Sequence, residues 1–178
     1  AERAADVIRR LRDLIRLGRS DTSSISVGRL VMEAASYCQS ELERSGVRLQ
    51  LQARRDLPDV SVDAIQIEQV IINLVRNSIE ALTDAGRYDG RITIEAEPNG
   101  PNEVAIRVRD NGPGFDPDLY ERAAAPFTTT KPGGLGLGLS LTRSIIEAHG
   151  GRLAIESGAN GAVVSFTLRA APARMVTA

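Results

Sequence analysis

Apolar residues recur along the chain with two different spacings, and these spacings predict its helices and strands. Spacings of three and four residues, which place side chains on one face of a helix, predict helices over 3–17, 27–44, 64–83 and 137–149. Alternation of apolar and polar residues predicts strands at 47–52, 58–63, 92–96, 104–108, 152–156 and 162–169. Segments rich in glycine, proline and small polar residues separate these elements. We therefore expect an α+β fold.

The same pattern divides the chain into one domain and a short N-terminal appendage. Residues 26–169 hold a continuous series of elements and form the expected domain, with Ser26 as the N-cap of its first helix. Residues 19–25 are small and polar and read as a linker, and 170–178 read as a disordered tail. The amphipathic helix in residues 1–18 needs a partner helix, so we expect a piece of a longer protein.

Composition narrows the classes of function. The net charge is −1, aromatic residues make up 3% of the chain, and there is no tryptophan, which disfavours nucleic-acid binding. Cys38 is the only cysteine, so no internal disulfide forms, and this fits a reducing compartment. No apolar run reaches membrane-spanning length. We expect a cytoplasmic domain, which is compatible with a membrane anchor elsewhere in a longer protein.

The stretch Asp110-Asn111-Gly112-Pro113-Gly114-Phe115 directly follows the strand at 104–108. Gly112 and Gly114 lack a Cβ atom, so the backbone can turn sharply and a flat ligand can lie against it. Asp110 places a hydrogen-bond acceptor at the strand end, suited to an amino group such as that of adenine. An ordinary turn is the alternative interpretation, because these residue types are all common in turns.

Two asparagines mark the helix at 64–83. Asn73 and Asn77 lie one turn apart on the face opposite its apolar residues. Asparagine is a poor residue for a helix interior, because its amide competes for backbone hydrogen bonds. Such a pair can present amide oxygens to a hydrated Mg²⁺ and the phosphates that it binds. The alternative is an ordinary solvated helix face.

A third stretch runs from Pro126 to Leu139. Its first half offers three threonines and Lys131, and its second half has glycines at 134, 136 and 138 that lead into a helix. Glycines at a helix start expose backbone N–H groups to phosphate oxygens, although a flexible surface loop would have the same composition. That helix ends at His149-Gly150-Gly151, which is typical of a C-terminal cap. Because His149 is the only histidine, a histidine-based metal site is excluded.

These stretches together resemble the ATP-binding catalytic domain of sensor histidine kinases, in the superfamily shared with gyrase, the heat-shock 90 chaperones and MutL. The resemblance covers residues 26–169 and rests on four ordered boxes: 73–81, 110–115, 126–131 and 134–139. Residues 145–152 and 9–12 are also similar to the rhizobial oxygen-sensing kinases.

The resemblance implies a Bergerat-type fold, a two-layer α/β sandwich in which three helices cover one face of a mixed sheet of about five strands. Residues 123–136 would form a nucleotide lid that orders when nucleotide binds. Residues 1–18 would be the end of the second helix of a dimerisation hairpin in a homodimer. The phosphoacceptor histidine would lie on the first helix of that hairpin, so this chain alone should not autophosphorylate. The response regulator's receiver domain would be the phosphate acceptor in turn.

The resemblance also implies roles for individual residues. Asp110 would accept the adenine amino hydrogen bond, while Gly112 and Gly114 leave room for the ring. Asn77 would bind Mg²⁺, with Asn73 as a further candidate ligand. The remaining ATP-binding candidates belong to the lid and to the glycine-rich box at 134–139: Thr130, Lys131, Gly134, Gly136, Leu137 and Gly138. Of these, Lys131 is also a catalytic candidate, together with Asn73 and Asn77.

One position departs from the family pattern. Many members carry a lysine that meets phosphate three residues after the second asparagine, and here that residue is Glu80. Arg76, on the same helix face, is the candidate replacement for that charge.

Three other functions stay open at this point. They are an ATP-hydrolysing module of chaperone or topoisomerase type, an anti-sigma or serine kinase, and a nucleotide-binding module without activity. The basic amphipathic helix at 3–17 favours the histidine kinase over the anti-sigma kinase, and the complete set of boxes disfavours the inactive module. In the hydrolysing branch, a glutamate that activates water stands where this chain has Asn73. An amide cannot take up a proton at neutral pH, so we expect very slow hydrolysis.

Overall fold

The computed structural model describes residues 21–114, 138–158 and 160–172. Its elements are β1 Ser23–Ile25, α2 Val27–Ser45, β2 Arg48–Ala53, β3 Val60–Val62, α3 Ala64–Asp84, β4 Arg91–Pro98, β5 Glu103–Asp110, α5 Gly138–Ala148, β6 Leu153–Gly158 and β7 Gly161–Arg169. Apart from β1, each described element therefore appears close to where the hydrophobic pattern predicts it.

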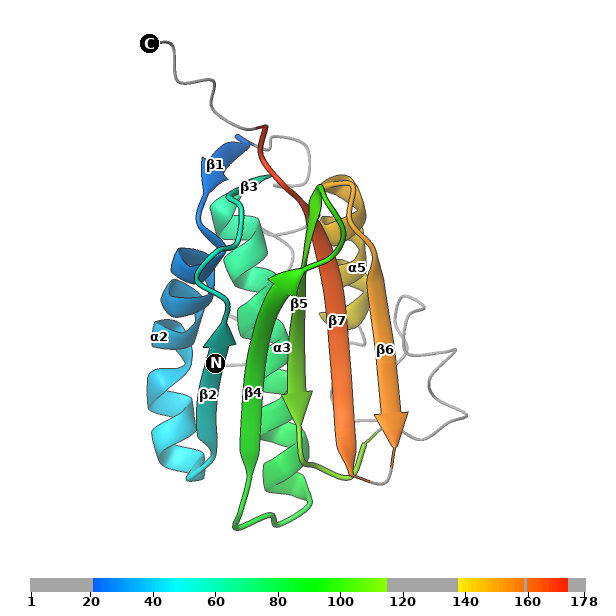
Figure 1. The fold of residues 1–178 in the computed structure, drawn as a ribbon. Coiled ribbons are helices and arrows are strands. Elements are labelled where there is room, and N and C mark those ends of the chain that lie inside the picture. The colour runs from blue at the N-terminus through cyan, green and yellow to red at the C-terminus, as the bar shows by residue number, and fades with distance from the viewer. Residues whose placement is uncertain (1–20, 115–137, 159, 173–178) are drawn as a thin grey trace.

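Five of the strands form one sheet in the order β2-β4-β5-β7-β6. The β2–β4 pair is parallel, whereas the three other pairs are antiparallel, so the sheet is mixed. Helices α2, α3 and α5 lie side by side on one face of this sheet (Figure 1). The structure confirms the predicted two-layer α/β sandwich.

The two faces of the sheet differ sharply in chemistry. Along β4 and β5 the even-numbered residues Ile92, Ile94, Ala96, Val104, Ile106 and Val108 are buried. On the opposite face, charged odd-numbered residues form ion pairs across the two strands: Arg107 with Glu97 and Arg109 with Glu95. Since side chains alternate between the faces of a strand, this pattern buries one face under the helices and leaves the other polar.

Helix α3 lies in the middle of the helical layer and supplies much of the core. Asp63 caps its start, because the side chain accepts a hydrogen bond from the backbone N–H of Gln66 at 3.2 Å. The apolar side chains at helical spacing on its inner face are buried: Ile67, Val70, Ile71, Leu74, Val75, Ile79 and Leu82. Among the described residues, no helix combines the length and the apolar character needed to cross a membrane.

Two predictions about the ends of the domain are wrong, for a common reason. Residues 23–25 of the expected linker form β1, which pairs with β3 in a small second sheet. The first two residues of the expected tail are paired as well, because Ala170 forms a β-bridge with Val60 and the N–H of Ala171 donates to the Asp59 carbonyl. These pairings join residues far apart in sequence, which local composition does not report. In addition, Ser26 has extended backbone angles, but its side chain makes no capping hydrogen bond.

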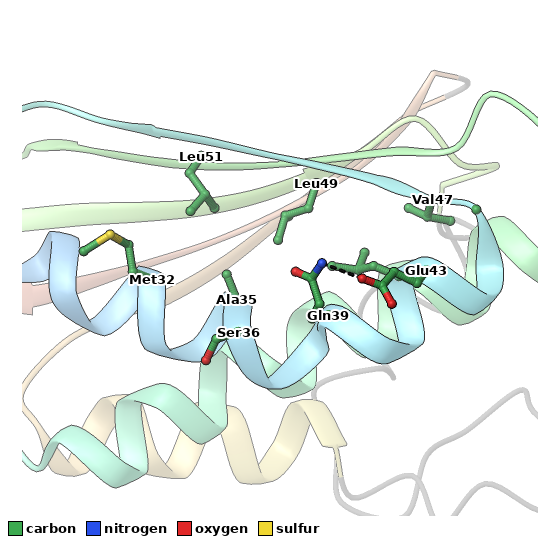
Figure 2. A pocket seen from close by; sticks show the side chains of 10 residues that line it. Met32, Ala35, Ser36, Gln39, Glu43, Val47, Leu49 and Leu51 are labelled. Atoms are coloured by element: carbon green, nitrogen blue, oxygen red, sulfur yellow. Dashed lines mark hydrogen bonds between the residues drawn. The ribbon is translucent and has the colours of Figure 1, made fainter.

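A shallow groove lies between α2 and β2 at the edge of the main sheet (Figure 2). Apolar side chains dominate its lining, including Met32, Leu42, Leu49 and Leu51. None of the predicted site residues lines it. The candidate site therefore lies elsewhere, on the side of α3 that faces away from this groove.

Candidate functional site

Asp110 is the last residue of the central strand β5 and continues its row of inward-facing side chains. The residue is only 8% exposed, and its carboxylate is held by three hydrogen bonds. Oδ2 accepts from the Ser78 hydroxyl on α3 at 3.0 Å, while Oδ1 accepts from the backbone N–H groups of Gly112 at 2.9 Å and Ala162 at 3.2 Å. Three separate segments thus fix the orientation of this carboxylate.

The two glycines after Asp110 are needed by the protein itself, besides any room that they leave for a ligand. A Cβ atom on Gly112 would lie 3.0 Å from Oδ1 of Asp110. Gly114 has a φ of +78° and packs against the β6–β7 hairpin, where a Cβ atom would overlap the carbonyl oxygen of Gly158. Gly112 thus lies close to the Asp110 side chain, and Gly114 packs against the backbone of the β6–β7 hairpin.

Gly161, at the start of β7, makes a similar close approach. Its φ is +122°, and a Cβ atom there would overlap the backbone carbonyl of Asp110. The next residue, Ala162, donates its N–H to the Asp110 side chain. Sequence analysis missed both residues, because their contact with Asp110 exists only when β7 pairs with β5.

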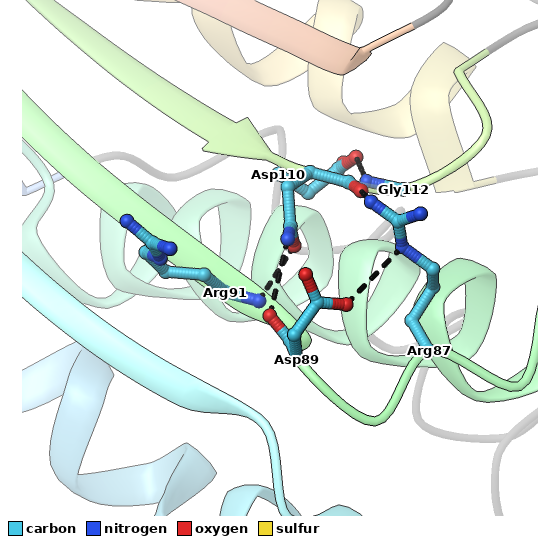
Figure 3. A network of polar contacts seen from close by, with 6 residues as sticks. Arg87, Asp89, Arg91, Asp110 and Gly112 are labelled. Atoms are coloured by element: carbon cyan, nitrogen blue, oxygen red, sulfur yellow. Dashed lines mark hydrogen bonds and ion pairs between the residues drawn. The ribbon is translucent and has the colours of Figure 1, made fainter.

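Asn111 joins the strand end to the loop that follows α3. Figure 3 shows Arg87, Asp89 and Arg91 of that segment near Asp110 and Gly112. Its side-chain oxygen accepts from the N–H of Arg91 at 2.7 Å, and its Nδ2 donates to the Asp89 carbonyl at 3.1 Å. Arg87 donates to the backbone carbonyl of Asn111 at 2.7 Å and contacts the Asp89 carboxylate at 3.5 Å. This network holds the backbone immediately after Asp110 in place.

Asn73 on α3 is tied to the first turn of α5. Its Nδ2 donates to the Gly138 carbonyl at 3.0 Å and to the Thr142 hydroxyl at 3.0 Å. A backbone carbonyl only accepts hydrogen bonds, so this contact fixes which way the amide points. A Cβ atom on Gly138 would lie 3.3 Å from Oδ1 of Asn73, so this glycine permits the close contact.

Asn77 is half-buried one turn further along α3. Its side chain makes no hydrogen bond within the described part of the chain, which leaves its amide oxygen free to coordinate a cation there. Arg76 points elsewhere: it binds the Glu41 carboxylate on α2 through two contacts, at 2.7 and 3.0 Å. This pairing disfavours Arg76 as the replacement for the missing lysine. Glu80 is exposed and has a polar partner of its own.

His149 has the capping role that the sequence predicts. Its Nδ1–H donates to the Ile145 carbonyl at 2.8 Å, and its Nε2 accepts from the Asp63 N–H at 3.1 Å. Gly150 follows with a φ of +70°. Both ring nitrogens are therefore engaged in joining the end of α5 to the start of α3.

Several predicted site residues lie outside the described residues. They are Thr130, Lys131, Gly134, Gly136 and Leu137, together with the whole of the predicted lid at 123–136. Of the other predicted site residues, the structure gathers Asn73, Asn77, Asp110, Gly112, Gly114 and Gly138 around α3, the end of β5 and the start of α5.

Ser78 and Thr142 are the main described contributors that the sequence analysis missed. Ser78 is 7% exposed and Thr142 1% exposed, and each bonds a predicted site residue. A signal for Ser78 was present in the sequence, because it is a hydroxyl among the apolar residues of the inner face of α3. Its partner could not be read from that pattern.

Comparison with known proteins first gives the class. A model of the family described as histidine kinase-, DNA gyrase B- and HSP90-like ATPase matches residues 62–172, which is more than half of the chain. The chain belongs to this ATPase family.

Individual relatives point to one branch of the family. The sensor protein FixL of Bradyrhizobium diazoefficiens is 38% identical over 172 residues, covering 96% of this chain and 34% of that protein. The catalytic domain of histidine kinase ThkA has a TM-score of 0.75 at 32% identity, covering 84% of this chain and 96% of that one. Histidine kinase ThkA in complex with its response regulator TrrA gives a TM-score of 0.76 at 26% identity, covering 96% of this chain and 49% of that one.

These findings confirm the predicted resemblance to sensor histidine kinases, including a rhizobial one. The chain spans about a third or less of the length of the first curated relatives that it matches.

Proposed function

We propose that this chain is the Mg-ATP-binding catalytic domain of a bacterial two-component sensor histidine kinase. It would donate the γ-phosphoryl group of ATP to a histidine on a dimerisation helix that is not among these 178 residues. The observation that carries the proposal is the inward-facing Asp110 carboxylate, fixed by three donors at the end of the central strand of an ATPase-family fold.

Asp110 suits the recognition of adenine. A carboxylate has about four acceptor positions, and the described residues fill three of them, which leaves one position for a ligand amino group. Gly112 and Gly114 keep the adjoining backbone free of side chains. Gly138 and the predicted residues Gly134, Gly136, Leu137, Thr130 and Lys131 would surround the triphosphate.

Asn77 suits Mg²⁺, which prefers oxygen ligands and keeps several of its waters. Its amide oxygen has no competing partner among the described residues, and no group of three or more His, Cys, Asp or Glu side chains there offers an alternative metal site. Bound Mg²⁺ would screen the phosphate charge during phosphoryl transfer. Asn73 stays a further candidate ligand through Oδ1, because its Nδ2 is already bound to α5.

Asn73 also explains why ATP would be conserved until an acceptor arrives. Its amide cannot act as a general base, and its Nδ2 is held by Gly138 and Thr142. Water near the phosphates would therefore lack a proton acceptor at this position. The γ-phosphoryl group would wait for the imidazole of the docked acceptor helix, which is itself a nucleophile.

The remaining partners follow from the proposed class. Residues 1–18 would end the second helix of the dimerisation hairpin, so the full-length protein would be a homodimer. Its phosphohistidine would pass the phosphoryl group to the receiver domain of a response regulator. We place this domain in the cytoplasm and expect no contact with nucleic acid.

The test is to measure phosphate release by the 178-residue chain with saturating Mg-ATP, alongside calorimetric binding of Mg-ATP. We expect binding with turnover far below about 1 per second, the range of ordinary enzymes. Turnover near that rate would instead favour an ATP-hydrolysing module. A stable phosphate on His149 would also contradict the proposal, because both its ring nitrogens are engaged.

A further inference from the structure

Ser78 lies on the inner face of α3, one residue after Asn77, and is 7% exposed. Its hydroxyl donates to Oδ2 of Asp110 at 3.0 Å across the interface between α3 and β5. Among the described side chains, no other is shown in hydrogen bonding to Asp110, since its two remaining donors are backbone N–H groups. Ser78 is therefore the contact to this carboxylate that a substitution can remove without changing the backbone.

The direction of this hydrogen bond has a chemical consequence. A carboxylate only accepts hydrogen bonds, so the single proton of the Ser78 hydroxyl must point toward Asp110. The free positions of the pair are then all acceptors: one on the carboxylate and the lone pairs of the hydroxyl oxygen. Such a pair is complementary to a donating amino group and repels a carbonyl oxygen.

We infer that Ser78 is a positioning residue for base recognition, which holds the Asp110 carboxylate so that its one open position selects a purine with a 6-amino group. This inference rests on the proposed nucleotide-binding function and assigns to Ser78 a role in specificity within that site. Without the hydroxyl, the two backbone donors still hold Oδ1, but Oδ2 loses its one partner among the described residues and its fixed orientation.

A purely structural role for Ser78 predicts a different result. If the hydroxyl served only to stabilise the α3–β5 contact, its loss would weaken the binding of all nucleotides by the same factor. A role in base recognition predicts a loss of affinity that depends on whether the nucleotide carries the 6-amino group. The ratio of two dissociation constants, measured on the same protein sample, separates these cases.

The experiment titrates the 178-residue chain with Mg²⁺ and either ATP or purine riboside 5′-triphosphate, which carries hydrogen in place of the amino group. Ser78→Ala is compared with the wild type. Ser36→Ala is the matched control, because its hydroxyl also bonds within the described chain but to the Glu33 carbonyl on α2. Thermal unfolding of each variant shows that the samples are folded.

We expect the wild type to prefer ATP, and Ser78→Ala to reduce this preference about three- to tenfold, the effect of losing one hydrogen bond. Ser36→Ala should leave the preference unchanged. An unchanged preference in Ser78→Ala, whether or not overall affinity falls, would overturn the role in specificity. A wild type that binds both nucleotides equally would overturn the assignment of Asp110 as the adenine anchor, and a wild type that binds neither would overturn the proposed function.

Discussion

Replacing Asp110 with asparagine separates the binding role of this residue from its structural role. In Asp110→Asn, the amide oxygen can still accept from the N–H groups of Gly112 and Ala162, which hold Oδ1 in the wild type. The amide nitrogen replaces Oδ2, and the Ser78 hydroxyl can rotate to accept from it. The fold therefore keeps its hydrogen bonds, although they lose the assistance of the charge.

The effect on nucleotide binding is expected to be much larger. The open acceptor position on Oδ2 becomes an N–H group, which faces the amino group of adenine with a second donor. Loss of a charge-assisted hydrogen bond costs about 1.5–3 kcal/mol, or roughly 10- to 150-fold in Kd.

Asp110→Ala should behave differently. It leaves the buried N–H groups of Gly112 and Ala162 without an acceptor, at about 1–3 kcal/mol each, so the free energy of unfolding should fall by roughly 2–6 kcal/mol. Calorimetry with Mg-ATP and urea unfolding measure the two effects. Asp56→Asn is the control, because it removes the same charge from an exposed carboxylate that pairs with Arg54.

Two results would refute this reasoning. If Asp110→Asn binds Mg-ATP with nearly the wild-type affinity, Asp110 does not contact the adenine amino group. If Asp110→Ala is as stable as Asp110→Asn, the two backbone N–H groups do not depend on the carboxylate for their hydrogen bonds.

Two further predictions concern stability. Gly114→Ala should lower the free energy of unfolding by about 2 kcal/mol or more, because φ is +78° and a Cβ atom would overlap the β6–β7 hairpin. Gly100→Ala, at the same φ in open space, is the matched control in urea unfolding, and an equal loss in both variants would exclude the overlap. Burial, with a hydrogen bond to Glu33, raises the pKa of Glu68 to about 7, whereas Arg29 holds the pKa of Glu33 below its usual value. The folded protein then binds a proton on Glu68 more tightly than the unfolded chain does. The contribution of Glu68 to the free energy of unfolding should therefore fall as pH rises from about 4.5 to about 7. Between pH 5 and pH 8, the free energy of unfolding should decrease less in Glu68→Gln than in the wild type. An identical pH dependence in the variant and the wild type would contradict the raised pKa.

The sequence by itself determined the elements of the domain and their inner faces. Helix α3 and strands β4 and β5 have hydrophobic periods long and regular enough to be read without knowledge of their neighbours. The four boxes also identified the class of protein, because glycine, asparagine and aspartate occur there at fixed spacings. These properties are local, and each depends on residues close together in the chain.

The tertiary structure decided which residues meet. The contacts of Asp110 with Ser78 and Ala162 join residues 32 and 52 positions apart. The contact of Asn73 with Thr142 joins residues 69 positions apart, and the pairing of Arg76 with Glu41 turned that guanidinium away from its predicted role.

The pairing of β1 with β3 likewise turned part of an expected linker into a strand. A strand at a sheet edge is defined by its partner's backbone as much as by its own side chains, and a short polar segment such as Ser23–Ile25 carries no hydrophobic period to reveal it. The hydrophobic pattern thus specified which surfaces become buried, whereas the packing of α3 against β5 and α5 specified the partners of each polar group in the site.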